Sequence, residues 1–200
     1  AGIWIGGTID GQLRTAATRY GPWEFWAGPI DEQGNPPADC AEYDRIYNIY
    51  KREITEYDRT RLASQDLLDW PWELGAPVID GDGNPDNYNL EGGDRPKIRG
   101  HQTLWWVMND RGNIHDASDT QPIGLEVHVT AFAAASNDEH VNNATLYHYK
   151  LINKNDKPYE NAYLGLFQDP DLGNFDDDYV GSDTTLGMGY AYNSDNDDEG

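Results

Sequence analysis

Apolar and polar positions alternate strictly in the run LEVHVTAF, where Leu125, Val127 and Val129 are separated by polar side chains. A period of two residues is typical of a strand with one buried and one exposed face. Three further runs are strand-like: HQTLWWVMND, ATLYHYKLIN and AYLGLFQD. Turn clusters such as NDRGN and NKNDKP separate the runs at hairpin-like spacing. The pattern therefore predicts a mainly β chain with antiparallel strands.

The start of the chain has the pattern of a β-hairpin. Two strand-like runs, AGIWIGGTI and QLRTAATRY, flank the dipeptide Asp10-Gly11. Such a dipeptide suits a two-residue turn in which both central residues need a positive φ. We therefore expect the first two strands to pair with each other across this turn.

The apolar period changes between about positions 41 and 61. Tyrosine and isoleucine recur there at intervals of three and four residues, which is the stripe of an amphipathic helix. Ser64 suits the N-cap of a second short helix, QDLLDW, and Pro71 closes it. We predict one domain, 1–200, of the antiparallel β-sandwich type with a helical insertion at about 41–69. The stripe residues are Tyr43, Ile46, Tyr47, Tyr50, Ile54 and Tyr57.

Composition narrows the classes of partner. The 200 residues suffice for one domain with one core, and an aromatic fraction of 12% argues against disorder. Lys and Arg number 14 against 36 Asp and Glu, so the formal net charge is -22. An excess of like charge destabilises a compact state unless cations offset it. The absence of a basic stripe excludes nucleic acid and disfavours an anionic membrane surface as partners.

The ends of the chain and its cysteine bear on the compartment. No apolar run approaches the roughly 20 residues that cross a bilayer, and no signal peptide is recognisable at the start. The chain has no initiator Met and stops within a loop-like run, so we expect a fragment of a longer protein. Cys40 is the single cysteine, which excludes an internal disulfide and is neutral between a cytosolic and an extracellular location.

The main candidate site is the acidic loop at 169–183, DPDLGNFDDDYVGSD. It holds six aspartates, and no Lys or Arg occurs beyond Lys157. Calcium takes six to eight oxygen ligands, and closely spaced Asp and Asn with Gly are usual in its loops. The alternative is a solvated acidic turn. The predicted calcium ligands are Asp169, Asp171 and either Asp178 or Asp183, with Asn174 and backbone carbonyls completing the set.

A second, weaker calcium candidate lies in DGDGNPDNYNLE. Its acidic and amide residues have the spacing of an EF-hand loop, but Pro85 stands where that loop needs Gly, and no helix pattern leads into it. The sequence therefore excludes an EF-hand and leaves a looser calcium turn or a solvated loop. The candidate ligands of this turn are Asp80, Asp82, Asn84 and Asp86.

Catalytic motifs are missing. The sequence has no G-x-S-x-G, H-E-x-x-H or P-loop motif, and its five histidines lack ligand spacing, so no catalytic residue is predicted. Tryptophans beside Asp69, Glu73 and Asp110 are typical of carbohydrate sites, although paired tryptophans in strands are usually core residues. The candidate carbohydrate-binding residues are Trp70, Trp72, Trp105 and Trp106.

Several blocks of the sequence are distinctive in combination, among them AGIWIGGTIDGQLRTAA, WPWELGAPVIDGDG and FQDPDLGNFDDDYVGSDTTLGMGYAYNSDNDD. Together they resemble a group of large uncharacterised surface proteins of the Bacteroidetes, and the similarity covers essentially the whole chain. Those proteins commonly end in a type IX secretion system sorting domain, which is absent here. The resemblance implies export and no known activity. Ser182 stands where relatives often have Cys, and Asp183-Thr184-Thr185 fits the O-glycosylation pattern of such proteins, with Thr184 as the acceptor.

These patterns predict a secreted, calcium-stabilised structural or adhesive domain of a cell-surface or extracellular assembly, of which a filament subunit is one form. Self-assembly or binding to other surface proteins is expected, with glycans as further partners. One alternative is a polysaccharide-binding module or a glycoside-active enzyme. The other is an inert scaffold without a metal.

Overall fold

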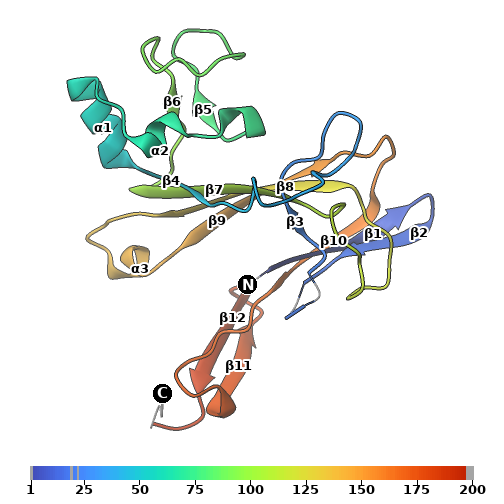
Figure 1. Ribbon diagram of the computed structural model, residues 1–200. Helices are drawn as coiled ribbons and strands as arrows, with labels where there is room; N and C mark the ends of the chain where they lie inside the picture. Colours follow the sequence, from blue (N-terminus) through green and yellow to red (C-terminus); the bar gives the residue numbers. More distant parts are fainter. Residues whose placement is uncertain (1, 19, 22, 197–200) are drawn as a thin grey trace.

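The chain is mainly β, with two antiparallel sheets that give it a sandwich-like architecture (Figure 1). The structure, a computed structural model, describes residues 2–18, 20–21 and 23–196. Ala1 and Arg19, at the ends of the runs predicted to form the first hairpin, lie outside these residues. The first sheet has the order β10-β1-β2, with β1 at Gly2–Ile9, β2 at Gln12–Ala16 and β10 at Glu160–Phe167.

The second sheet has the order β3-β7-β8-β9, and a short strand, β4, also pairs with β7. Two further pairs of strands are separate from these sheets: β5 with β6, and β11 with β12. The strands are β3 (Trp26–Ala27), β4 (Tyr47–Tyr50), β5 (Val78–Ile79), β6 (Arg95–Pro96), β7 (Gln102–Asn109), β8 (Leu125–Ala133), β9 (Leu146–Asn153), β11 (Asp178–Asp183) and β12 (Met188–Asn193). The helices are α1 (Lys51–Thr60), α2 (Gln65–Leu68) and α3 (Glu139–Asn142), with 3-10 turns at η1 (Trp72–Leu74) and η2 (Phe175–Asp177).

The predicted hairpin at the start of the chain is confirmed. β1 and β2 pair up to Ile9 opposite Gln12, and both turn residues, Asp10 and Gly11, have positive φ values of 52° and 73°. The strands predicted from LEVHVTAF, HQTLWWVMND, ATLYHYKLIN and AYLGLFQD are confirmed as β8, β7, β9 and β10.

The first half of the predicted helical insertion is wrong, and the second half is helical. The helix begins at Lys51, because the preceding YNIY segment is strand β4, in which Ile49 pairs with Thr103 of β7. Pairing with β7 buries Ile49 completely, which outweighs the helical spacing of its neighbours. Ser64 is confirmed as the N-cap of α2, since its hydroxyl accepts a hydrogen bond from the Leu67 backbone at 3.2 Å.

The core has two parts, one on each face of the second sheet. On one face, Trp105 packs with Tyr57 of α1 and Leu67 of α2. We call α1 and α2 the helical segment; it lies over this face in Figure 1. On the other face, Val127 and Val129 of β8 pack against residues of the first sheet such as Ile5. Strand β8 is therefore buried on both faces, and the predicted exposed face of this strand is wrong.

A buried polar network ties the loop after β7 to β2. The ring nitrogens Nδ1 and Nε2 of His115 each lie 2.6 Å from a backbone carbonyl oxygen, of Thr15 and Asp110 respectively. The His115 ring therefore bridges the backbone of β2 and the backbone of the loop after β7. A carboxyl oxygen of Glu24 and one of Asp110 each lie 3.8 Å from the ring. This network is structural, because all its side chains are buried.

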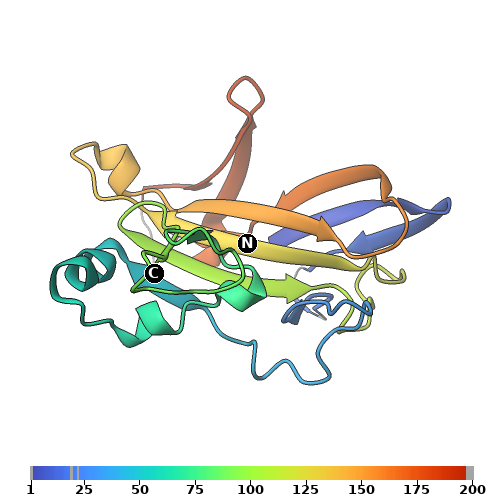
Figure 2. The same cartoon turned by 90° about the horizontal axis from the view of Figure 1, so that it is seen from above.

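The last two strands extend away from the sheets. In both views the hairpin of β11 and β12 projects from the body of the sandwich (Figures 1 and 2). Its tyrosines, Tyr179, Tyr190 and Tyr192, contact one another along one face with tilted rings and are exposed. Among the described residues, no helix is long and apolar enough to cross a membrane.

Candidate metal centre

Three aspartates converge between β5 and β6, and we call them the three-aspartate group: Asp80, Asp82 and Asp94. Each offers one carboxylate oxygen, and these oxygens all lie within 4.8 Å of one another. The pairing of β5 with β6 explains why these three aspartates lie close together. Ile79 pairs with Arg95, so Asp80, which follows Ile79, is brought opposite Asp94, which precedes Arg95. Residues far apart in sequence thus share one small volume.

The buried Asp94 side chain holds two parts of the loop together. Its side chain is buried, and its two oxygens accept hydrogen bonds from the backbone N–H groups of Gly81 at 2.8 Å and Asn89 at 2.7 Å. The next residue, Arg95, bonds the carbonyl of Leu90 and forms a 2.6 Å ion pair with Asp58 of α1. The loop is therefore anchored to the helical segment at the point where it turns back.

Asp80 and Asp82 are exposed and are held by the loop itself. One oxygen of Asp80 accepts hydrogen bonds from the Gly83 and Asn84 backbones at 2.6 and 3.1 Å. One oxygen of Asp82 accepts from the Asn89 side chain at 2.9 Å, and the other from the Asn84 backbone at 3.0 Å. These bonds, with that of Asn89 the strongest, lower the pKa of Asp82 below its ordinary value, so this carboxylate stays ionised.

Glycines allow the two ends of the loop to approach. A Cβ added at Gly81 would collide with the backbone of Gly93, and one added at Gly92 would collide with the Asn89 side chain. Any larger residue at these positions would push Asp80 and Asp82 away from Asp94. The packing of this loop thus requires glycine at positions 81 and 92.

The group could hold a metal ion. Three carboxylates with no Lys or Arg in the group form a hard, negatively charged set of oxygens, which is the ligand chemistry of calcium and magnesium. An amide oxygen in the same loop, Oδ1 of Asn87, is buried and accepts no hydrogen bond, while the nitrogen of that amide donates to Asp82. Loop carbonyls and amides of this kind complete calcium coordination in proteins.

The group includes two of the residues predicted for the second calcium site. Asp80 and Asp82 belong to the group, whereas Asn84 contributes backbone hydrogen bonds and Asp86 lies outside it. Asp94 was not predicted as a ligand, because it stands far along the chain and joins the group only through the β5–β6 ladder. The repeated Gly-Asp pairs on both sides of the loop are the sequence signal that points to it.

The acidic loop at 169–183 does not gather its predicted ligands. Asp178 and Asp183 begin and end β11, which separates them by about 16 Å at roughly 3.3 Å per residue, so one ion cannot bind both. The carboxylate of Asp183 instead accepts hydrogen bonds from the backbone N–H groups of Thr185 and Leu186, at 2.8 and 3.1 Å, in the turn that follows. In the described part of the chain, the carboxylates of this loop form no group of three.

The remaining predicted ligands of that loop have local partners. Asp169 accepts a hydrogen bond from the hydroxyl of Tyr20, and Asp178 accepts one from the Leu172 backbone at 2.9 Å. Asn174 caps the 3-10 turn η2 through its side-chain oxygen. Asp171 is exposed. These contacts hold the local conformation of the loop.

The tryptophans predicted to bind carbohydrate do not form one surface. Trp70 and Trp105 are buried in the core beneath the helical segment, so they cannot contact a sugar, and this part of the prediction is wrong. Trp106 follows Trp105 in β7 and points to the opposite face, against the other core cluster. Trp72 lies beside Asp69 and Glu73 in a surface hollow of about 510 Å³, and Trp106 lines a different hollow.

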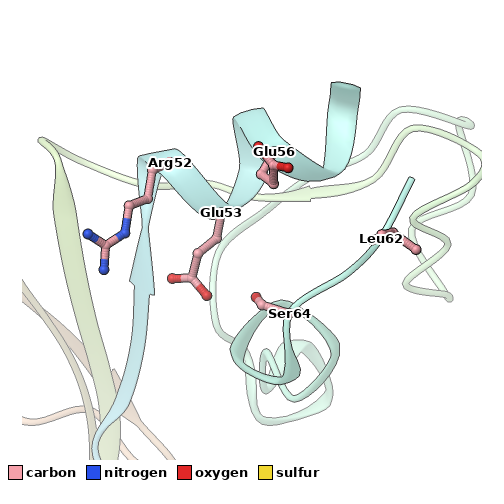
Figure 3. A pocket seen from close by; sticks show the side chains of 5 residues that line it. All are labelled: Arg52, Glu53, Glu56, Leu62 and Ser64. Atoms are coloured by element: carbon pink, nitrogen blue, oxygen red, sulfur yellow. The ribbon is translucent and has the colours of Figure 1, made fainter. Parts of the chain in front are cut away.

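A smaller hollow lies between α1 and the start of α2, and Figure 3 shows the side chains that line it. Its volume is about 290 Å³, and two carboxylates face it. Both carboxylates already have structural partners: Glu53 accepts a hydrogen bond from the Tyr50 backbone at 2.8 Å as part of the helix cap, and Glu56 pairs with Arg59 at 2.6 Å. This arrangement provides no free acid or base for catalysis.

Thr184 and Cys40 are both accessible to solvent. Thr184, the predicted glycosylation acceptor, is exposed in the turn between β11 and β12, and its modification stays a prediction. Cys40 is a partly exposed free thiol.

Comparisons with protein-family models, curated proteins and solved structures found no match to this chain.

Proposed function

We propose that this chain is a calcium-stabilised structural domain of a cell-surface or extracellular assembly. The observation that carries the proposal is the convergence of Asp80, Asp82 and Asp94 in a loop whose backbone already holds them together. Extracellular calcium is on the order of millimolar, which suffices for modest sites of this kind. The resemblance to exported Bacteroidetes surface proteins supports the location.

The role of the ion is structural. A net charge of -22 favours expansion of the chain, and a divalent cation at the three-aspartate group offsets part of it where three carboxylates meet. The ion would also fix the loop between β5 and β6, which is tied to α1 through Arg95. Because the cation binds the folded loop and not the unfolded chain, binding adds to the free energy of unfolding.

Calcium is expected to raise the melting temperature. When free calcium exceeds Kd about 100-fold, binding adds about 2.7 kcal/mol to the free energy of unfolding, and each kcal/mol corresponds to roughly 2–4 °C in a chain of this size. Asp82→Asn should abolish the increase, because it removes one charge and one ligand. The measurement is thermal unfolding in excess chelator and in calcium, with magnesium at the same ionic strength as a second condition.

A matched control separates the ion from a general effect of charge. Asp86→Asn removes the same charge from the same exposed loop but leaves the three-aspartate group intact, so it should keep the calcium response. Loss of the response in Asp178→Asn instead would place the ion in the acidic loop at 169–183. An unchanged midpoint in calcium, together with no metal in elemental analysis, would remove the proposal.

We propose a second function, polysaccharide binding, for the hollow at Trp72. Its lining combines Trp72 and Tyr47 with Arg45, Asp69 and Glu73, which are aromatic, cationic and carboxylate groups of the kind that sugars contact. Hydrogen bonds from Gln65 and Arg45 lower the pKa of Asp69, so this carboxyl is not the protonated acid that a glycosidase needs. The hollow therefore suits binding rather than hydrolysis.

Glycan binding, measured on an array, should be lost in Trp72→Ala and retained in Trp23→Ala. Trp23 is an exposed tryptophan outside the hollow, so it controls for a loss of aromatic surface as such. Trp72 also packs against the core, and melting curves must show that the variant is folded. A folded parent chain that binds no glycan on the array would remove this second function.

A further inference from the structure

The core face of the first sheet continues onto β10 without a cover. Ile3 and Ile5 of β1 lie directly opposite Leu166 and Leu164 of β10, and side chains opposite each other in an antiparallel pair share one face. The two isoleucines are 2% and 5% exposed, whereas Leu164 and Leu166 are 58% and 71% exposed. The apolar face that packs on the core thus extends by one strand beyond the residues that cover it.

The second sheet is open on the same side of the sandwich. Tyr147 and Leu151 of β9 lie opposite Ala131 and Val127 of β8, on the face that packs toward the first sheet. Ala131 and Val127 are buried, but Tyr147 is 55% exposed. Apolar side chains on the inner faces of both edge strands, β9 and β10, are therefore left exposed, although Tyr149 of β9 packs against the core.

A groove lies where β10 ends and the β11–β12 hairpin begins. Its volume is about 620 Å³, and its lining is largely apolar. In the part of the chain that is described, β10 pairs with β1 along one edge and with no strand along the other, so the backbone groups of the outer edge are available to a further strand. We call this surface the open groove; its main residues are Leu166, Pro170, Leu172, Val180, Tyr190 and Ala191.

We propose that the open groove binds a β-strand of another protein, a strand with aliphatic side chains at alternate positions and Lys or Arg at its ends. Pairing along the free edge of β10 would supply backbone hydrogen bonds. The alternate aliphatic side chains would cover Leu164 and Leu166, which stand two residues apart on one face. The β11–β12 hairpin would gain a packing partner, which a two-stranded pair needs for stability in water.

The negative charge near the open groove indicates what kind of strand would bind there. No Lys or Arg occurs beyond Lys157, whereas aspartates at 169, 171, 176, 177, 178 and 183 belong to the segment that forms the groove and the hairpin. A second copy of the chain would place the same negative segment, within a net charge of -22, against this one. A strand with basic ends is complementary in charge to this segment.

This inference deepens the proposed assembly function, because it names the chemistry of the partner, but it uses no residue of the three-aspartate group. The probe is a synthetic peptide of alternating Val and Thr with two Lys at each end. Titration calorimetry in calcium should detect binding. A peptide with Glu in place of Lys should bind at least about tenfold more weakly, and so should a peptide methylated at alternate backbone amides, which cannot pair as a strand.

Two leucine variants test the location. Leu166 and Leu186 are each 71% exposed, but Leu186 lies in the turn between β11 and β12, outside the lining of the open groove. Leu166→Asp should weaken peptide binding at least about tenfold, and Leu186→Asp, which adds the same charge, should leave it unchanged within about twofold. Both side chains are exposed, so both variants should fold with the parent melting temperature.

Three results would overturn the inference. The first is no binding of the basic peptide by the folded chain. The second is equal binding of the methylated peptide or by Leu166→Asp, which would indicate charge attraction without strand pairing. The third is a dimer in sedimentation that Leu166→Asp dissociates, which would make a second copy the occupant. A calcium-dependent melting temperature that persists in these cases would leave the proposed calcium stabilisation standing.

Discussion

Glu126 is a buried carboxylate on β8 with three partners. It accepts a hydrogen bond from the Ile30 backbone at 2.7 Å, its other oxygen lies 2.8 Å from Nε2 of His128, and Nζ of Lys154 lies 3.3 Å away. Burial alone raises the pKa of Glu126, but the bonds from His128 and Ile30 and the charge of Lys154 outweigh it, so the net pKa is lowered. The carboxylate thus links β8 to the loop after β3.

The lowered pKa of Glu126 makes its contribution dependent on pH. The folded state holds the charged form more tightly than the unfolded chain, so the contribution is present above the unfolded value of 4.5 and is lost as pH falls through the lower folded pKa. Glu126→Gln should lower the free energy of unfolding by about 2 kcal/mol at neutral pH, the size of hydrogen bonds to a charged group. Below about pH 4 the difference between parent and variant should shrink.

Denaturant unfolding of both chains across this pH range checks the prediction. His128→Gln is a useful companion, because it removes one partner of Glu126 but keeps the carboxylate. A difference between the parent chain and Glu126→Gln that stays constant down to pH 3 would show that the charge of Glu126 contributes nothing.

At the scale of elements, the strands were predictable and their surroundings were not. Alternation identified β8, yet the polar positions Glu126 and His128 are buried, because the loop after β3 contacts Glu126 through Ile30 and the Trp105 ring of β7 packs against His128. The three-residue and four-residue spacing around Tyr47 predicted a helix, but the edge of β7 was free to pair with that segment. A local sequence pattern shows which side chains are polar. Whether those side chains are buried depends on the elements that pack against the strand.

The candidate site was predictable to the same extent. Asp80 and Asp82 stand close in sequence and were expected to share an ion, and they do lie together. Asp94 joins them through a ladder of only two residue pairs, too short to leave an alternating pattern. The acidic loop had the denser run of aspartates, but an extended strand carries Asp178 and Asp183 apart. Density of charge in the sequence is therefore a poor guide to convergence in space.

At the scale of the whole molecule, the net charge of -22 should make stability depend on salt. Self-repulsion destabilises the compact state, and monovalent salt screens it, since the Debye length falls from about 30 Å at 0.01 M to about 10 Å at 0.1 M. The melting temperature in chelator should rise by a few degrees between about 0.01 and about 0.5 M NaCl, at roughly 2–4 °C per kcal/mol.

Asp82→Asn separates the effect of salt from the effect of calcium. The variant should keep nearly the whole response to NaCl, because it changes the net charge by one, from -22 to -21, and should lose the additional response to calcium at fixed ionic strength. A melting temperature that falls as NaCl is added would mean that attractive ion pairs, such as Arg95 with Asp58, outweigh the repulsion.

The pairing of β1 with β10 sets the order in which the molecule can be completed. Gly2 lies opposite Phe167, so a strand at the beginning of the chain finds its neighbour only near the end. Contacts of such long sequence separation close late and slow folding. During synthesis, which proceeds from the N-terminus, the β1–β2 hairpin would lack this neighbour until β10 has been made. In the meantime Ile3 and Ile5 would be accessible to chaperones and proteases.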